Sequence, residues 1–369
     1  MDYMKRALAL AAQGHPNVYP NPLVGAVIVK EGRVIAEGYH QAYGGPHAEI
    51  HALQNATESV VDATMYVTLE PCSHFGKTPP CAHAIIAAGI NKVVVASVDP
   101  NPLVSGQGIA LLKEAGISVE MSGDDTAQQA LNHRFMTVMK QQRPFVILKS
   151  AMSADGKIAT VTGESKYITG PAAREAVHRT RAGVKAVLVG SQTAQCDNPS
   201  LNVRYFEPDE QPTRIVIDAQ AECSLNLTLF RSAQTQPTFW VVGDHITASK
   251  RDEAQRLGVH VLALPLQDGH TDWGRLGQEL IKLGLDAILI EAGSQLAFHL
   301  LRIGWFDQWH CYIAPIILGG QSAHSVVGGT GIESINEAVS LRCIEVKNYG
   351  DDLRITYQKK DDVYVYRDY

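Results

Sequence analysis

The regular alternation of short apolar strands with helices is the feature that most constrains how this chain can fold. In the first part, apolar and β-branched residues predict strands at 23–30, 33–40, 64–69, 92–98 and 117–121, with helices between them. The strand at 92–98, KVVVASV, is almost wholly apolar, which is typical of a strand buried on both faces of its sheet. We therefore expect a compact α/β unit of three layers.

A break in this pattern predicts a domain boundary. The helix expected at 125–141 stops before Arg143-Pro144, because a proline disfavours helical backbone in the residue before it. The chain has 369 residues, more than one average domain of ~150. Beyond the break, strands and helices alternate again, and two runs at 341–350 and 351–360 predict a terminal hairpin. We expect domains at 1–143 and 144–369, each α/β with its own core.

The composition argues against several classes of protein. The net charge of -6 disfavours nonspecific binding to nucleic acid, which depends on a basic surface. No apolar run reaches the roughly 18–20 residues that a membrane helix needs. The start, MDYMKRALALAAQG, is typical of an amphipathic helix and not of a signal peptide. The six cysteines are then expected to be reduced, in a cytoplasmic protein.

Two segments, PHAEIHAL (46–53) and EPCSHFGKTPPC (70–81), carry the residues of a metal site. His47 with Cys72 and Cys81 offers one imidazole and two thiolates, which suit Zn²⁺. Three protein ligands leave one position open for water, as in catalytic zinc sites, and the metal lowers the pKa of that water. Glu49 is not needed as a ligand and can carry the proton to a leaving amine.

His-x-Glu followed by Pro-Cys-x-x-Cys is the residue set of zinc base deaminases. Here eight residues separate the cysteines instead of two, so a surface loop with two ordinary cysteines is the alternative interpretation of that segment alone. His51 and His74 are spare candidates, each more typical of a surface or supporting histidine. His40 is equally consistent with a position facing the pocket and with a plain strand end.

The second half lacks the GxGxxG of an ordinary dinucleotide-binding fold. Its best phosphate cradle is LIEAGSQLAFHL (289–300), where a strand ends at Gly293 and a helix N-terminus follows. Arg181 and Arg204 suit a sugar phosphate, although each is also consistent with a solvated surface arginine. The glycine-rich run at 327–335 does not clearly follow a strand and is interpreted as a flexible connection.

The motifs GYHQAYGGPHAEIHAL, TLEPCSHFGKTPPC, PNPLVGAVIV and VDPNP closely resemble the bifunctional deaminase–reductase family of riboflavin biosynthesis, over nearly the whole chain. The resemblance implies a cytidine-deaminase-like domain followed by a dihydrofolate-reductase-like domain. It implies deamination of 2,5-diamino-6-(5-phosphoribosylamino)pyrimidin-4(3H)-one. It also implies that NADPH then reduces the ribosyl group of 5-amino-6-(5-phosphoribosylamino)uracil to ribityl.

The same resemblance implies roles for individual residues. It implies His47, Cys72 and Cys81 as the Zn²⁺ ligands and Glu49 as the proton carrier. NADPH contacts are implied at Ala151, Tyr167, Thr193, Asp197, Gly293, Ser294, Gln295, Leu296, Ala297, Phe298 and His299. Substrate contacts are implied at Asn21, Lys149, Ser165, Arg181, Leu201, Arg204 and Glu291. The family often has Trp where this chain has Tyr167, so an aromatic ring is retained.

Two rival functions follow from the same residues. The first is a zinc deaminase of a nucleoside, a free base or RNA with a nucleotide-sensing C-terminal domain, and the acidic charge balance argues against RNA. The second is a binding module with structural zinc, which would gain nothing from Glu49 beside an open coordination position. The expected partners are the small pyrimidine ribose-phosphate substrate and further copies of the chain in a homo-oligomer, with neither nucleic acid nor membrane.

Overall fold

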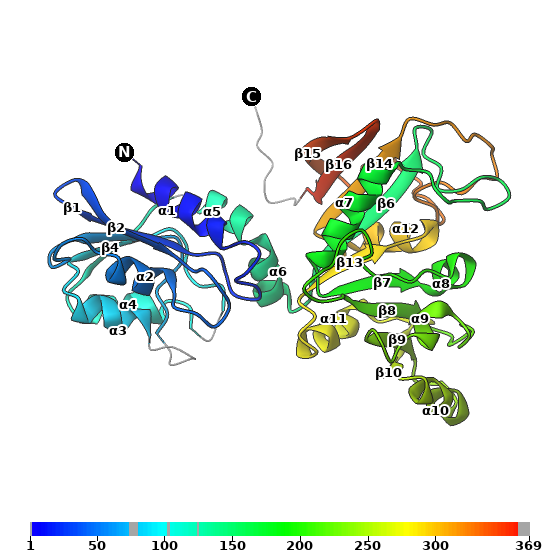
Figure 1. Cartoon of the computed structure of the whole chain (residues 1–369), viewed down its shortest axis with the longest axis horizontal. Coiled ribbons are helices and arrows are strands. Elements are labelled where there is room, and N and C mark those ends of the chain that lie inside the picture. Colours follow the sequence, from blue (N-terminus) through cyan, green and yellow to red (C-terminus); the bar gives the residue numbers. More distant parts are fainter. Residues whose placement is uncertain (1, 74–79, 102–103, 124, 361–369) are drawn as a thin grey trace. The chain divides into compact units, whose positions relative to one another are not determined.

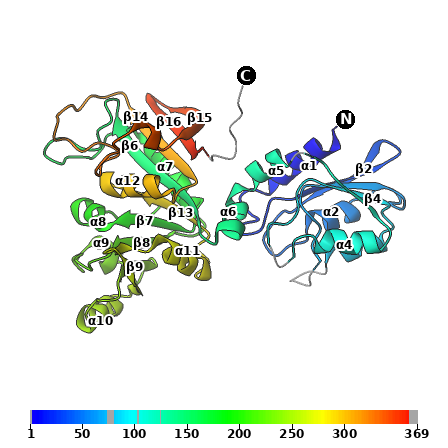
Figure 2. The same cartoon turned by 180° about the vertical axis from the view of Figure 1, so that it is seen from behind.

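A computed structural model describes residues 2–73, 80–101, 104–123 and 125–360. The chain divides into two compact units, Met1–Gln142 and Arg143–Tyr369. Both contain a sheet with helices packed on it (Figures 1 and 2), which confirms the α/β class. Within the described residues, no helix combines the length and the apolar character that crossing a lipid bilayer requires.

The first unit is built on a five-stranded sheet in the order β2-β1-β3-β4-β5. β1 is antiparallel to β2 and β3, whereas β3, β4 and β5 are parallel. Its elements are α1 (Tyr3–Ala11), β1 (Gly25–Lys30), β2 (Arg33–Tyr39), α2 (Ala48–Gln54), β3 (Thr64–Val67), α3 (Cys81–Ala87), β4 (Lys92–Val95), α4 (Gln107–Glu114), β5 (Ser118–Met121), α5 (Thr126–Leu131) and α6 (His133–Gln141), with a 3-10 turn at Ala12–Gly14.

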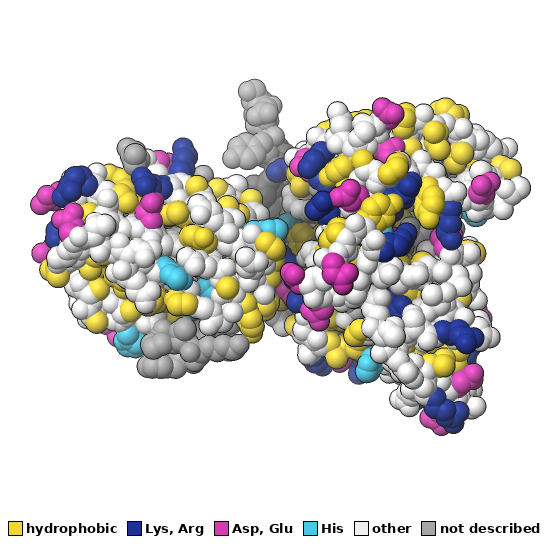
Figure 3. All heavy atoms as spheres, in the orientation of Figure 1, with side chains coloured by type: hydrophobic (Ala, Val, Ile, Leu, Met, Phe, Trp, Pro, Cys, Tyr) yellow, Lys and Arg dark blue, Asp and Glu magenta, His cyan; other side chains and the backbone are white. Residues whose placement is uncertain are grey.

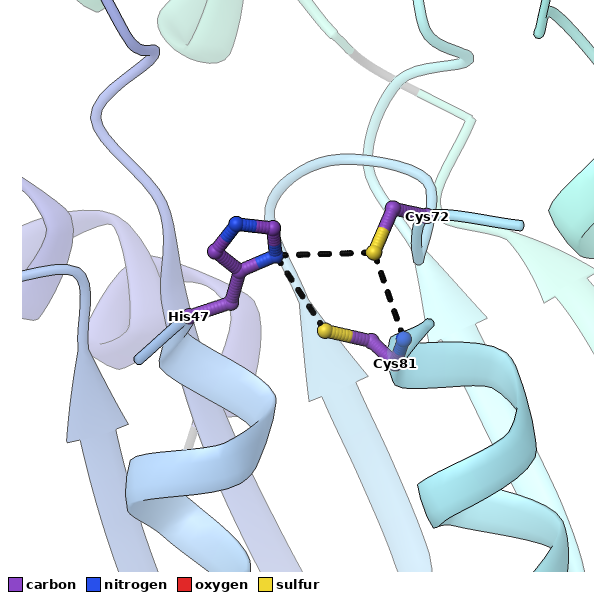
Figure 4. A group of neighbouring side chains, drawn as sticks. All are labelled: His47, Cys72 and Cys81. Atoms are coloured by element: carbon purple, nitrogen blue, oxygen red, sulfur yellow. Dashed lines mark hydrogen bonds between the residues drawn. The ribbon is translucent and has the colours of Figure 1, made fainter. Parts of the chain in front are cut away.

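Helices cover both faces of this sheet. α1 packs its apolar side on Val27 and Val29, and α2, α3 and α4 contribute to the larger core on the opposite face. Gly38 allows α2 to approach β2 closely, because a Cβ there would lie 2.5 Å from the carbonyl oxygen of Ala48. The result is the expected three-layer arrangement, with the beginnings of α2 and α3 as neighbours (Figure 4).

The helix predicted at 125–141 is two helices. α5 ends at Leu131 and α6 begins at His133. Between them, the buried side chain of Asn132 accepts from the Leu23 N–H at 2.7 Å and donates to the Leu23 carbonyl at 2.9 Å. These bonds anchor the helical segment to a residue far away in the sequence, which no local pattern reveals.

The second unit is built on a nine-stranded sheet in the order β10-β9-β8-β7-β13-β6-β14-β16-β15. Its strands are β6 (Phe145–Ser153), β7 (Ala186–Gly190), β8 (Thr213–Asp218), β9 (Thr238–Gly243), β10 (His260–Leu264), β13 (Ala287–Glu291), β14 (Gln308–Ala314), β15 (Leu341–Tyr349) and β16 (Asp352–Lys359). A separate small ribbon consists of β11 (Leu266–Gln267) and β12 (His270–Thr271). All strands from β10 to β14 in this order are parallel, and β14, β16 and β15 are antiparallel.

Two cores cover the faces of this sheet. Apolar residues of α11 (Trp273–Lys282) and α12 (Ser294–Ile303) form one, and those of α8 (Ser191–Asp197), α9 (Thr228–Arg231) and α10 (Ala248–Arg256) contribute to the other. α7 (Pro171–Ala182) packs on Tyr312 of β14. The predicted alternation of strands and helices in this half, and the terminal hairpin, are confirmed. α8 and α9 are missed by the sequence reading, because four to seven residues are too short to show a helical period.

Candidate functional site

The three predicted metal ligands converge in the first unit. His47 directly precedes α2, Cys81 is the first residue of α3, and Cys72 lies in the loop after β3. The Nδ1 atom of His47 lies 3.5 Å from Cys72 Sγ and 3.3 Å from Cys81 Sγ (Figure 4). The Cys81 backbone N–H donates to Cys72 Sγ at 3.2 Å, so this sulfur is held by the start of α3.

The geometry of this cluster suits a zinc ion. All three donor atoms lie within 4.8 Å of one another. Ligands at 2.0–2.3 Å from a tetrahedral ion are about 3.5 Å apart, which matches the nitrogen–sulfur distances. Among the described residues no fourth His, Cys, Asp or Glu joins the group. His74, the spare candidate, lies outside the described residues, and His51 does not belong to the cluster.

Glu49 lies in the first turn of α2, two residues after His47, and is only 3 % exposed. Burial, and then the nearby thiolate of Cys72, raise the pKa of Glu49 to about 7, although His47 acts in the opposite direction. A carboxyl group with a pKa near neutrality can both take up and release a proton at physiological pH. The position and the environment therefore suit the predicted proton carrier.

Asn21 and His40 form a fixed pair beside the cluster. Nδ1 of His40 lies 2.9 Å from the carbonyl oxygen of Pro46, so this nitrogen carries the proton. Nε2 then accepts from the amide of Asn21 at 3.1 Å. The rings of His40 and His47 lie 5.5 Å apart. His40 is buried and faces the cluster, which decides between its two interpretations.

Glu70, two residues before Cys72, supports the surroundings of the cluster and was not predicted from the sequence. Its buried carboxylate accepts from four backbone N–H groups, those of Asp99 and Gly106 in the loop before α4 and those of Gly108 and Ile109 in the first turn of α4. A Cβ at Gly108 would lie 1.9 Å from the carbonyl oxygen of Pro71, so the first turn of α4 also packs directly on the residue before Cys72. Asp99, one of the four donors, belongs to the VDPNP motif. The signal in the sequence is an acidic residue beside a Pro-Cys pair.

The second unit contains a cavity of about 450 Å³. It is lined by residues of β6, α7, α8 and the junction of β13 with α12. Twelve of the predicted contacts line it, namely Lys149, Ala151, Ser165, Tyr167, Arg181, Thr193, Asp197, Arg204, Glu291, Gly293, Ser294 and Gln295. Lys and Arg side chains gather on the face where α7 lies (Figure 3).

Five predicted contacts do not line this cavity. Leu201 and Ala297 are buried, and Leu296 packs on the core between the sheet and α12. Phe298 packs under Gly329, where a Cβ would lie 2.0 Å from the ring. His299 lies beside Trp273, with ring centroids 6.1 Å apart. Their contacts with ligands remain predictions.

Three charged side chains that line the cavity, Lys149, Arg181 and Glu291, lie close together. Glu291 and Lys149 are paired in register on β13 and β6, and Arg181 Nε donates to Glu291 Oε1 at 2.6 Å. Burial alone would raise the pKa of Glu291, but the positive charges of Arg181 and Lys149 outweigh it and hold the pKa at about 2. Burial lowers the pKa of Lys149, while Glu291 opposes this shift.

Arg174 and His178 also line the cavity and were missed by the sequence reading. The Arg174 guanidinium lies 4.4 Å from the ring centroid of Tyr167. Arg174, His178 and Arg181 lie at positions i, i+4 and i+7 of α7, which places two arginines and a histidine on one face of the helix. This spacing in PAAREAVHRTRA is the signal that identifies them.

Comparisons with known proteins match both halves of the chain. Residues 1–97 match the family model described as the cytidine and deoxycytidylate deaminase zinc-binding region. Residues 144–355 match the RibD C-terminal domain. The riboflavin biosynthesis protein RibD of Actinobacillus pleuropneumoniae is 44% identical over 97% of this chain and 94% of its own. The Escherichia coli protein of the same name is 40% identical over 95% of this chain and 97% of its own.

Solved structures show the same similarity. One form of RibD from Acinetobacter baumannii superposes with a TM-score of 0.82 at 38% identity, covering 97% of this chain and 98% of that one. A diaminohydroxyphosphoribosylaminopyrimidine deaminase/5-amino-6-(5-phosphoribosylamino)uracil reductase from Thermotoga maritima gives a TM-score of 0.77 at 32% identity, with the same coverage. These matches confirm a cytidine-deaminase-like domain followed by a reductase domain. The chain therefore belongs to the RibD family of bifunctional deaminase–reductases of riboflavin biosynthesis.

Proposed function

We propose that the first unit deaminates 2,5-diamino-6-(5-phosphoribosylamino)pyrimidin-4(3H)-one. The second unit then reduces the ribosyl group of the product, 5-amino-6-(5-phosphoribosylamino)uracil, to ribityl with NADPH. The observation that carries the proposal is the convergence of His47, Cys72 and Cys81 beside the buried Glu49. The activities named for the Thermotoga maritima relative support the choice of substrates. The match of the second half to a reductase family disfavours a nucleotide-sensing domain.

In the deamination step, His47, Cys72 and Cys81 would hold a zinc ion, which would supply an activated water as the nucleophile. Glu49 takes a proton from the nucleophile and delivers one to the departing amino group, so that ammonia leaves as a neutral molecule. Asn21, fixed by His40, orients the pyrimidine through hydrogen bonds. Burial of Glu49 keeps its proton from exchanging freely with solvent.

In the reduction step, the residues at the start of α12 suit the phosphates of NADPH. A Cβ at Gly293 would lie 3.0 Å from Thr193 Oγ1, so the glycine leaves this corner of the cavity open to a ligand. The backbone N–H groups at Ser294 and Gln295 belong to a helix N-terminus, which favours anions. NADPH supplies the hydride. Lys149, held opposite Glu291, faces the reacting sugar, and Arg204 binds the phosphate of the substrate.

The decisive test compares Glu49→Gln with the unchanged chain in two assays. The variant should keep bound zinc and lose ammonia release from the diaminopyrimidine phosphate by roughly 100-fold or more, the usual contribution of a proton carrier. NADPH oxidation on the deaminated substrate should stay unchanged, because Glu49 belongs to the other unit. Unaltered ammonia release would contradict the proposal, and faster release from cytidine would favour a nucleoside deaminase.

The proposal also covers the setting in which the enzyme works. All six cysteines are free, and Cys196 and Cys343 are exposed, which supports a reducing compartment such as the cytoplasm. A homo-oligomer is the expected assembly. Light scattering on the purified chain tests the assembly, and a monomer at micromolar concentration would contradict it.

A further inference from the structure

The segment Leu201–Arg204 leads to Arg204, which lines the cavity of the second unit, and it has a constrained conformation. Leu201 is buried with φ at +51°, in the left-handed region that a branched apolar residue rarely adopts. Such backbone persists only where the surroundings impose it. The structure therefore has to contain groups that hold this segment in place.

Three side chains hold three consecutive residues of the segment. Arg181 Nη1 donates to the carbonyl oxygen of Asn202 at 2.8 Å. The Gln211 amide binds Val203 on both sides, accepting from its N–H at 2.8 Å and donating to its carbonyl at 2.9 Å. His178 Nδ1 accepts from the Arg204 N–H at 3.3 Å. The backbone is therefore fixed from Asn202 to Arg204.

The Arg204 side chain itself is left available. Arg204 is exposed and lines the cavity, and within the described part of the chain its guanidinium makes no hydrogen bond or ion pair. The guanidinium of Arg181, by contrast, is already occupied by Glu291 and Asn202. Arg174 donates to the Tyr205 hydroxyl and to the Thr169 carbonyl. Of these three arginines, Arg204 is the one free to bind an anion with its planar fork of donors.

His178 suits the task of a neutral acceptor. It is only 3 % exposed, and its ring centroid lies 4.6 Å from that of Tyr205. Burial, followed by the charges of Arg181 and Arg204, lowers the pKa of His178 to about 4, although Glu291 opposes the shift. At neutral pH the ring is therefore uncharged, with a bare Nδ1 toward the backbone N–H and the proton on Nε2.

We propose that His178 and Gln211 are positioning residues that hold the backbone at 203–204, so that Arg204 is presented in advance to the phosphate of the reductase substrate. This inference rests on the proposed function, because it takes the ribosyl phosphate as the ligand of Arg204. Gln211 does not line the cavity, and His178 acts through the hydrogen bond between its Nδ1 and the Arg204 N–H. Both residues order the loop before the substrate binds, which lowers the entropic cost of binding.

The test compares two substrates in the reductase assay, the phosphorylated aminouracil riboside and its dephosphorylated form. In Gln211→Ala and His178→Phe, the KM for the phosphorylated substrate should rise about tenfold, as expected for a displaced binding group. The kcat, the KM for NADPH and the values for the dephosphorylated substrate should stay within about twofold of the unchanged chain. Gln220→Ala, which removes a side-chain bond to the backbone of Gly269, is the matched control.

Further variants separate positioning from general loss of structure. His178→Asn offers a carbonyl oxygen in place of Nδ1 and should recover part of the lost affinity. In the Arg204→Ala background, Gln211→Ala should add nothing, since the group that it positions is gone. Thermal unfolding confirms that each variant is folded. Equal losses on both substrates, additive losses in the double variant, or an unchanged KM would overturn the inference.

Failure of the underlying function gives a different result. If the unchanged chain does not discriminate between the two substrates, or if Arg204→Ala leaves the KM for the phosphorylated one unaltered, then Arg204 does not bind the phosphate. If those two controls behave as expected and only the Gln211 and His178 variants have no effect, the positioning role alone is wrong. Inorganic phosphate, tested as a competitive inhibitor, gives a second readout of the same site.

Discussion

Glu291 shows how neighbouring charges determine the state of a single buried residue. Its carboxylate lines the cavity beside Arg181 and Lys149. The pKa of Glu291, about 2, is below the ordinary value of 4.5. Because the folded state binds the proton more weakly, the charged group stabilises the fold above about pH 4.5. That contribution is lost as the pH falls from about 4.5 toward 2.

Glu291→Gln should therefore make the second unit less sensitive to acid. At pH 7 we expect a loss of roughly 3 kcal/mol in the free energy of unfolding, and between pH 4.5 and 2 a smaller further decline than in the unchanged chain. Urea unfolding followed by tryptophan fluorescence measures this unit alone, because Trp240, Trp273, Trp305 and Trp309 all belong to it. Glu253→Gln on α10 is the exposed control. If the free energy of unfolding fell as steeply between pH 4.5 and 2 in Glu291→Gln as in the unchanged chain, Glu291 would not be the source of this acid sensitivity.

At the scale of elements, Glu70 connects the loop before α4 to the segment that carries Cys72. Glu70→Gln replaces one acceptor oxygen by an NH₂ group that faces backbone N–H donors. We expect zinc affinity and ammonia release to fall by about 10- to 100-fold, as for other residues that support metal ligands. NADPH oxidation should not change.

The matched control for this prediction is Glu114→Gln, an exposed carboxylate at the end of α4. It should leave both activities as they are. Competition with a chelator of known affinity measures zinc binding in the two variants. If Glu70→Gln bound zinc as tightly as the control and released ammonia as fast, the loop would not support the metal site.

The elements that could be predicted are those whose own residues decide their form. The apolar runs of β4 and β13 and the Gly293-Ser294 start of α12 are visible in the sequence. The break between α5 and α6 is not, because it depends on the contact of Asn132 with Leu23. The metal ligands and Glu49 were predictable because chemistry restricts their types and spacing. The roles of Glu70 and His178 were not, since each binds backbone from a distant segment. Gln211 binds Val203 only eight residues away, but across an irregular loop that no periodic pattern reveals.

At the scale of the whole molecule, each unit has its own core and its own candidate site. The metal cluster belongs entirely to Met1–Gln142, and the cavity belongs entirely to Arg143–Tyr369. The membership of the chain in the RibD family agrees with two chemistries in one polypeptide. Removal of zinc should therefore abolish one activity and spare the other.

Zinc titration of the metal-stripped chain, with ammonia release and NADPH oxidation followed on the same samples, tests this account most directly. We predict that ammonia release is lost on stripping and returns in proportion to zinc, reaching its maximum at about one ion per chain. NADPH oxidation on the deaminated substrate should remain constant throughout. Full ammonia release by a chain free of metal would contradict the account.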